Sequence, residues 1–217
     1  MIHVIRSAKP AILQQNEHVW LTDLQAATSA DERKARQSRY RHPEIRQALE
    51  AMFHGKCAFC EARITHITHS DIEHFSPKAH FAHRTFVWEN LLLACPRCNR
   101  GHKRDQFPTT SDGRPLLLDP TIDDPTEHLR FLWHSRSATS VVLGKTTQGR
   151  TTRRLLGLNR SDLRSHRDPQ VKRLALVAAY APTDPRAKQI LCEAMQADKE
   201  YAAFARALAA QVGISCP

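Results

Sequence analysis

The chain has 217 residues, of which 41% are hydrophobic and 25% are charged. These fractions are typical of globular proteins and exclude a disordered, collagenous or coiled-coil chain. Aromatic residues make up only 6% of the chain and glycines number only 7, which favours a helix-rich fold over a β-sandwich. The apolar runs are too short to span a bilayer, and no apolar stretch typical of a secretory signal follows Met1 to Pro10. We therefore expect a cytoplasmic protein that does not act at a membrane.

The positive charge of the chain is concentrated in one stretch. The net charge is +10, from 32 basic and 22 acidic residues. Residues 130–173 alone contain eleven Lys and Arg residues against Asp162 and Asp168. Such a stretch favours a polyanionic partner, and a solvated basic surface is an equal alternative. It could extend a nucleic-acid track or dock on an acidic patch of a partner protein.

Two helices are predicted before the first cysteine. Ser29 and Glu32 form a capping-box pattern that opens a charged helix reaching about Tyr40. Pro43 suits a first helical position, and Gly55 suits the stop of the helix that it begins. The apolar stripe of this second helix consists of Ile45, Leu49, Met52 and Phe53. A helix therefore delivers the chain to Cys57.

The pattern changes twice after that point. Residues 57–107 show short apolar runs broken by Gly, Pro and polar clusters, which predicts short strands and loops with one helix near the end. A proline-punctuated linker follows, and residues 141–143 read as a short strand. Asp168 and Asp184 each precede a proline, which predicts two terminal helices, the second running to Gly213. We expect a helical segment over 1–56, a core of short strands and loops over 57–110, and a basic linker with helices over 111–217, all in one compact body.

Two Cys-x-x-Cys pairs are the most specific signal in the chain. They are Cys57 with Cys60 and Cys95 with Cys98. Four thiolates on two tight turns can converge tetrahedrally on a structural Zn²⁺. Disulfides are the weaker alternative in a cytoplasmic chain, and a redox pair would leave the second motif idle. We interpret Cys192 as a small buried residue and Cys216 as a terminal bystander.

The residues that the two pairs enclose carry a second pattern. A carboxylate precedes a histidine at Glu73-His74, Pro77 follows, and an amide precedes an apolar pair at Asn90-Leu91. The second cysteine pair runs directly into Asn99, with Lys103 behind it. In order and spacing, these elements resemble the HNH endonuclease superfamily, in the form framed by two zinc-binding cysteine pairs.

The resemblance implies a role for each matching residue. His74 would be the general base, Asn90 would orient the His74 loop, and Glu73 with Asn99 would bind a catalytic divalent cation, Mg²⁺ or Mn²⁺. The final ligand position, near His102 or Lys103, is not clearly filled. The implied fold is α+β and predominantly helical, with a zinc-stapled ββα-metal core flanked by N- and C-terminal helices.

Basic residues flank this proposed centre. They are Lys78, Arg97, Arg100, Lys103 and Arg104. We expect them to contact phosphates on either side of the scissile bond, which positions a substrate without reading its sequence. The remaining histidines of the segment, His66, His69, His80 and His83, have no motif role, and we expect them in loops or at the surface.

A narrower resemblance covers about residues 40–135. Gly55 to Glu61, Ile72 to Lys78, Trp88 to Leu91 and the run from Pro115 to Pro120 resemble the PtuB nucleases of Septu and related retron-type anti-phage systems. This implies DNA as the target, with RNA such as tRNA open, and a separate ABC-type ATPase partner like PtuA. The chain contains no Walker A pattern of its own.

Two other classes of function remain open at this point. One is a zinc-stapled nucleic-acid-binding adaptor without catalysis, which has no need of Glu73, His74 and Asn90. The other is a redox or metal-sensing regulator, which leaves His74 and Asn90 unexplained.

Overall fold

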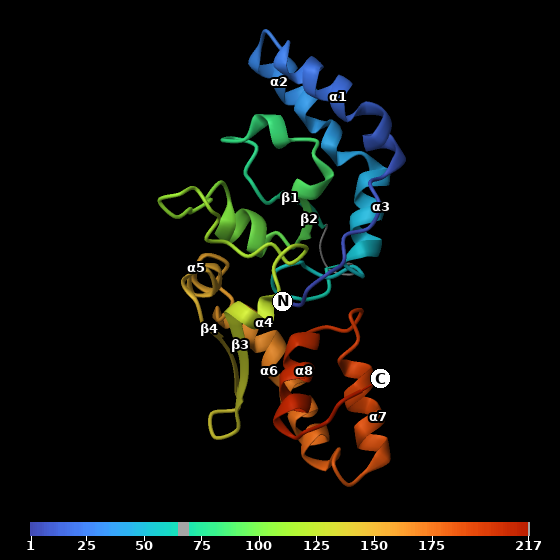
Figure 1. The fold of residues 1–217 in the computed structure, drawn as a ribbon, viewed down its shortest axis with the longest axis vertical. Helices are drawn as coiled ribbons and strands as arrows, with labels where there is room; N and C mark the ends of the chain where they lie inside the picture. The colour runs from blue at the N-terminus through green and yellow to red at the C-terminus, as the bar shows by residue number, and fades with distance from the viewer. Residues whose placement is uncertain (65–69, 217) are drawn as a thin grey trace. The chain divides into compact units, whose positions relative to one another are not determined.

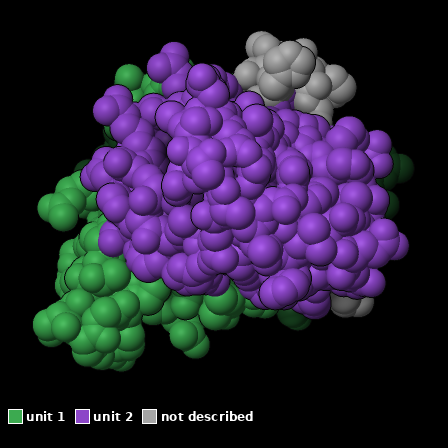
Figure 2. All heavy atoms as spheres, turned by 90° about the horizontal axis from the view of Figure 1, so that it is seen from above, with its two compact units in different colours: residues 1–4, 59–63, 108–217 green, residues 5–58, 64–107 purple. Residues whose placement is uncertain are grey.

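The computed structural model of the chain describes residues 1–64 and 70–216. They divide into two compact units, which Figure 2 colours separately. One unit comprises residues 5–58 and 64–107, and the other comprises residues 1–4, 59–63 and 108–217. His66 and His69 lie outside the described residues. Among those described, no helix combines the length and the hydropathy that a membrane crossing requires.

The unit of residues 5–58 and 64–107 surrounds a two-stranded sheet. Its helices are α1 (Ala11–Gln25), α2 (Ala30–Gln37) and α3 (Pro43–Met52), with the 3₁₀ turn η1 (Ser38–Arg41) before α3. Strand β1 (Asp71–His74) pairs antiparallel with β2 (Leu91–Ala94), placing His74 opposite Leu91. The turns η2 (Ala82–Arg84) and η3 (Trp88–Asn90) lie between the strands, and the π-helical segment η4 (Arg97–Lys103) follows β2. This succession of two strands and a helix is the α+β core that the sequence predicted (Figure 1).

Local sequence explains the two predicted helices of this unit. Ser29 accepts a hydrogen bond from the Glu32 backbone N–H at 3.1 Å, as an N-cap should. The Glu32 carboxylate binds the N–H of Thr28 instead of that of Ser29, so the capping box is half formed. Helix α3 begins at Pro43 and is stopped by Gly55, which adopts a positive φ of 65° and donates to the Glu50 carbonyl. Both helices confirm the predicted starts.

The other unit packs helices on a β-hairpin. It contains α4 (Pro125–His128), β3 (Leu129–His134), β4 (Thr139–Gly144), α5 (Thr147–Leu155), α6 (Ser161–Tyr180), α7 (Pro185–Ala194) and α8 (Ala202–Gln211). Strands β3 and β4 pair antiparallel, and Phe131 packs on Phe204 of α8 with ring centroids 5.2 Å apart. Arg167 is buried over the Phe204 ring and donates to Ser140 and to the Leu158 carbonyl. One basic residue of the 130–173 stretch, Arg167, therefore belongs to the core of this unit.

Two expectations about the terminal helices are wrong. The dipeptide Asp168-Pro169 does not begin a helix, because α6 starts at Ser161 and carries Pro169 inside it. The Asp168 carboxylate accepts from Ser140 instead of capping a helix. The second predicted terminal helix, α7, starts at Pro185 with an Asp184 cap as predicted. It ends at Ala194 and does not run to Gly213, because a separate helix α8 follows Tyr201, whose φ is 55°.

Cys192 and Cys216 form a disulfide, with their Cα atoms 5.6 Å apart. The expectation of two unrelated cysteines was therefore wrong. The reason is that the chain after α8 returns to α7, so that residues 24 positions apart become neighbours. No periodicity or motif in the sequence marks that return.

Gly149 allows α5 to approach the end of α4 closely. A Cβ at this position would stand 1.9 Å from the carbonyl oxygen of His128. Because the clashing atom belongs to the backbone, no rotamer change can relieve the overlap. We expect Gly149→Ala to lower the free energy of unfolding by about 1–3 kcal/mol, as overpacking does, despite alanine's better helix propensity. Urea denaturation would check this; Gly101→Ala, where an added Cβ would meet only the Pro96 carbonyl oxygen at an ordinary 3.8 Å, is the comparison for a glycine without a close contact. An equally stable Gly149→Ala protein would contradict the packing.

Candidate active site

The four predicted cysteine ligands come together. The sulfur atoms of Cys57, Cys60, Cys95 and Cys98 all lie within 4.8 Å of one another. None of the four is in a disulfide, and three are buried while Cys95 is half-buried. Tetrahedral Zn–S bonds of about 2.3 Å would place sulfurs roughly 3.8 Å apart, so the cluster has the donors and the size for such an ion. The Cys98 N–H points at the Cys95 sulfur at 3.4 Å, which is the turn geometry that a metal knuckle needs.

The knuckle is attached to the sheet that carries the histidine. The N–H of Ala58 donates to the Leu93 carbonyl of β2 at 2.8 Å, and Cys95 directly follows β2. Since β2 pairs with β1, an ion at the cysteines would fix the strand that ends in His74. The cysteine cluster and the proposed catalytic residues are therefore parts of one local structure.

His74 is buried and held in one tautomer. Only 6% of the residue is exposed, and its Nε2 lies 2.9 Å from the carbonyl oxygen of Thr85. Because a carbonyl can only accept, Nε2 carries the proton and Nδ1 keeps the lone pair. Burial lowers the pKa of His74 from 6.5 to about 4, with the positive charges of Lys78 and Lys103 adding to the effect and the Thr85 bond opposing it. The imidazole is thus neutral near pH 7 and able to accept a proton at Nδ1.

Asn90 fixes the loop around this imidazole. Its side chain is fully buried, and its Oδ1 accepts from the Ser76 N–H at 2.7 Å. Its Nδ2 donates to the carbonyl oxygens of Ser76 and Arg84, both at 3.0 Å. Ser76 follows His74 by two residues and Arg84 precedes Thr85, so one amide ties together both chain segments that hold the imidazole. This is the arrangement that the orienting role requires.

The carboxylate of Glu73 lies in a buried ion pair. Its Oε1 is 2.5 Å from Nζ of Lys103, which also donates to the His74 carbonyl at 2.9 Å. Burial raises the pKa of Glu73, and the Lys103 ammonium offsets part of that rise. Lys103 was expected to contact phosphate, but a wholly buried ammonium cannot reach one in this structure. The residue instead holds Glu73 and the end of β1.

A second carboxylate stands beside Glu73. Asp71 precedes it by two residues on β1, and alternate residues of a strand project from the same face. The Asp71 Oδ2 accepts from Nδ2 of Asn99 at 3.1 Å and from Nε of Arg100 at 3.0 Å. We did not single out Asp71 from the sequence, although its i, i+2 spacing from Glu73 in a predicted strand was the available signal.

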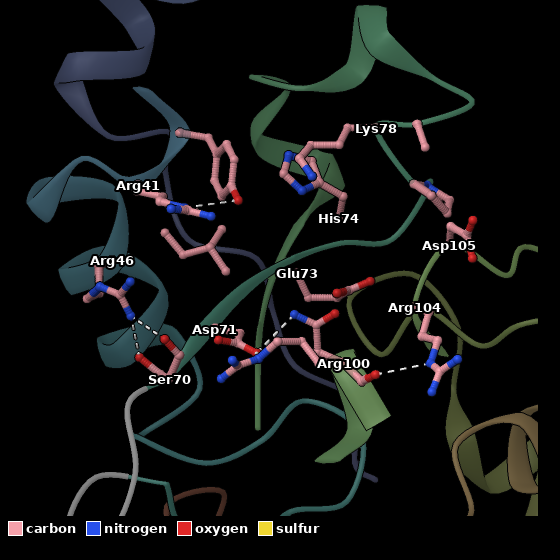
Figure 3. Close-up of a pocket in the computed structure, with 15 residues that line it drawn as sticks. Arg41, Arg46, Ser70, Asp71, Glu73, His74, Lys78, Arg100, Arg104 and Asp105 are labelled. Atoms are coloured by element: carbon pink, nitrogen blue, oxygen red, sulfur yellow. Dashed lines mark hydrogen bonds and ion pairs between the residues drawn. The ribbon is translucent and has the colours of Figure 1, made fainter. Parts of the chain in front are cut away.

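These residues line one pocket of about 640 Å³ (Figure 3). Its lining includes the proposed site residues Asp71, Glu73, His74 and Asn99. It also includes the basic residues Lys78, Arg100 and Arg104, which we expected near the centre. Arg97 is exposed and does not line it, nor do His80 and His83. Tyr40, Arg41 and Arg46 also line the pocket, from η1 and α3. The sequence motifs gave no signal for these three.

The oxygen donors of the pocket suit a hard divalent cation. Two carboxylates and the amide of Asn99, whose Nδ2 is already engaged with Asp71, offer hard oxygen atoms of the kind that Mg²⁺ and Mn²⁺ prefer. Arg100 and Lys103 partly neutralise those carboxylates. The donor set is therefore compatible with the predicted ion, with Asp71 added to the predicted pair of ligands, Glu73 and Asn99.

Burial of a neutral His74 predicts how stability depends on pH. Below pH 6.5 the unfolded chain binds a proton at this residue that the folded chain takes up only near pH 4. The free energy of unfolding should therefore fall as the pH drops through this window, by about 3 kcal/mol at roughly 1.4 kcal/mol per pH unit. Urea denaturation from pH 7 to 4.5 should show a steeper loss for the wild type than for His74→Gln. Parallel curves would contradict the buried neutral imidazole.

Comparison with known proteins agrees with this geometry. The sequence model of the HNH endonuclease family matches residues 57–105, which contain the cysteine cluster, β1, β2 and η4. The Septu protein PtuB of Bacillus mycoides (strain KBAB4) is 33% identical over 161 residues, covering 60% of this chain and 55% of that protein. The Septu protein PtuB of Bacillus thuringiensis is 32% identical over 165 residues, covering 75% of this chain and 56% of that protein. The chain thus spans little more than half the length of these relatives.

Proposed function

We propose that this chain is a metal-dependent nuclease that hydrolyses phosphodiester bonds of nucleic acid, with DNA as the preferred substrate. Its residues 57–105 match the HNH endonuclease family. The observation that supports this most is the placement of His74 in the same pocket as Asp71, Glu73 and Asn99, with a tautomer fixed by Thr85 that leaves the lone pair on Nδ1. A protein that only binds nucleic acid has no use for a buried neutral imidazole beside two carboxylates.

Each side chain has a part in the reaction. His74 takes a proton from the attacking water at Nδ1, and the Thr85 carbonyl stabilises the resulting imidazolium through Nε2–H. Asn90 keeps both loops around the ring in place. Asp71, Glu73 and Asn99 would hold the divalent cation, which when bound supplies the charge that offsets the departing oxygen. The four cysteines would hold Zn²⁺ as a structural ion.

Asp71 provides a test of this ligand set. We expect Asp71→Asn to weaken Mn²⁺ binding by about tenfold or more, because it replaces a charged oxygen ligand with a neutral amide next to Asn99. Titration calorimetry with Mn²⁺ on the zinc-loaded protein would measure the change. Asp105→Asn, a lining acid outside the proposed ligand set, is the matched control. Equal Mn²⁺ affinities for wild type and Asp71→Asn would remove Asp71 from the ligands.

The biological setting of this nuclease is part of the proposal. Since the relatives are named Septu proteins, we propose that the chain acts in anti-phage defence. We further propose that a separate ABC-type ATPase gates its cleavage, as the resemblance to the PtuB nucleases implies; the absence of a Walker A pattern from this chain agrees with a separate partner. The exposed bases of residues 130–173 would then either continue the nucleic-acid track or meet this partner.

The substrate and the partner can be tested in one experiment. The purified chain, alone and co-purified with the ATPase encoded beside it, would be incubated with plasmid DNA and with tRNA in Mg²⁺ or Mn²⁺. We expect cleavage of DNA, with the partner raising its rate. Cleavage of tRNA alone would favour an RNA-directed effector, and tight binding of both without cleavage under any condition would favour the non-catalytic adaptor.

A further inference from the structure

Two basic side chains each lie near one aromatic ring beside His74. The ring is that of Tyr40 in η1, which is buried and packs edge-on against the imidazole with centroids 4.6 Å apart. The guanidinium carbon of Arg41 lies 5.5 Å from the Tyr40 centroid, and the Arg41 Nε donates to the Tyr40 hydroxyl at 3.2 Å. Nζ of Lys78 lies 5.8 Å from the same centroid. Figure 3 shows Arg41 and Lys78 on the His74 side of the pocket, away from Asp71 and Arg100.

Neither of these two cations forms a close ion pair with a described carboxylate, although the Lys78 charge lowers the pKa of Glu73. Within residues 1–64 and 70–216, neither Arg41 nor Lys78 has an ion-pair partner within 4.0 Å. The nearby carboxylates are engaged elsewhere, Asp71 with Arg100 and Glu73 with Lys103. Arg41 and Lys78 both line the pocket and add two positive charges to it, and such charges attract an anion. The pocket therefore carries positive charge next to His74.

We propose that Arg41 and Lys78, held in place by the Tyr40 ring, form the binding site for the substrate phosphate that neighbours the scissile phosphate. The proposal rests on the proposed nuclease function and names a substrate subsite within it. The planar guanidinium of Arg41 suits bidentate contact with a phosphate, and Lys78 adds a second positive charge at the same ring. Both cations lie near the ring that packs on His74. The phosphate that they bind is therefore adjacent to the scissile phosphate, at which His74 activates the attacking water.

The subsite gives the N-terminal segment a direct part in substrate binding. Arg41 and Tyr40 precede the HNH domain of residues 57–105, whereas Lys78 lies within it. η1 is joined to α3 at Pro43, so the capped start of that helix sets the position of Arg41. The domain alone would therefore lack one side of its own substrate site.

Binding without cleavage tests the subsite independently of catalysis. The anisotropy of a fluorescent single-stranded oligonucleotide would be measured without Mg²⁺ over a series of salt concentrations. Arg41→Ala and Lys78→Ala should each weaken binding several-fold at about 0.15 M salt. Each should also reduce the slope of log K against log salt by about 0.7, the value for one lost contact on a single strand. Arg41→Lys should recover most of the slope, because the charge is restored.

The control for nonspecific loss of charge is Lys34→Ala, an exposed base of α2 outside the pocket. It should leave the salt slope unchanged. Identical slopes for wild type, Arg41→Ala and Lys78→Ala would overturn the proposal, as would an equal reduction in Lys34→Ala.

Substrates with one neutral methylphosphonate locate the contact. Cleavage by the wild type in Mg²⁺ or Mn²⁺ should show a raised KM when the phosphate next to the scissile one is neutral. Arg41→Ala should have a raised KM on the unmodified substrate and no further response to that replacement. A response in Arg41→Ala equal to that of the wild type would overturn the assignment of this phosphate. If neither the wild type nor any variant cleaves any substrate, the nuclease proposal fails. The salt slopes then decide alone whether the anion site exists.

Discussion

His74→Ala is expected to lower the rate of phosphodiester cleavage by about 10²–10⁴-fold, the usual contribution of a general base. The loss should fall on kcat, because the imidazole acts on the attacking water and contributes little to the binding of nucleic acid. Plasmid cleavage in Mg²⁺ or Mn²⁺, measured under single-turnover conditions, would give the change.

The same variant should keep its fold and its bound zinc. The imidazole is hydrogen-bonded to Thr85 and its ring packs on Tyr40, and neither of these residues belongs to the cysteine cluster. The control is His83→Ala, a nearby histidine that does not line the pocket. Cleavage by His74→Ala at the wild-type rate would remove the general base, and a loss of equal size in His83→Ala would show that the effect is not specific.

Cys57→Ser is expected to unfold the segment that carries β1, β2 and η4. Structural zinc in small sites contributes folding free energy on the order of 10 kcal/mol, which is comparable to the whole stability of a typical domain. Loss of one thiolate from the four should therefore abolish zinc binding and the ordered packing of Ile72, Leu92 and Leu93. Zinc content by elemental analysis and near-ultraviolet circular dichroism would measure both effects.

Cys192→Ser provides a matched control for this change. It also replaces one cysteine with serine, but it opens the disulfide to Cys216 and leaves the four clustered thiols untouched. We expect it to retain a full complement of zinc. A zinc-free Cys57→Ser protein with a wild-type spectrum would contradict the structural role of the metal, whereas zinc loss in Cys192→Ser would mean that the ion is bound elsewhere.

The predictions that held rest on residues whose chemistry acts locally. The two Cys-x-x-Cys turns, the Ser29 cap, the Pro43 start and the Gly55 stop each depend on a few neighbouring residues. The spacing of a metal knuckle or the φ of a helix end can therefore be read directly from the sequence. The convergence of the four sulfurs was also predictable. A structural zinc ion needs four ligands, and each Cys-x-x-Cys turn supplies two.

The features that the sequence did not reveal depend on contacts between distant segments. Lys103 reads as a phosphate contact by its charge, yet it is buried because Glu73 and the His74 carbonyl offer it partners. Asp168-Pro169 reads as a helix start, yet Asp168 bonds Ser140 of a strand nearly thirty residues earlier. Tyr40 and Arg41 reach the pocket because α3 packs on β2 and the Tyr40 ring packs on His74 of β1. Such pairings leave no periodicity in the chain.

Diffraction from crystals of the zinc-loaded protein soaked in Mn²⁺ would test the central claim most directly. The account predicts an anomalous manganese peak in the pocket, about 2.2 Å from oxygens of Asp71, Glu73 or Asn99, with His74 Nδ1 facing it across the position of the attacking water. A separate zinc peak should lie among the four cysteine sulfurs. A manganese peak remote from His74, or none at saturating Mn²⁺, would contradict the assignment of this pocket as a metal-dependent nuclease centre.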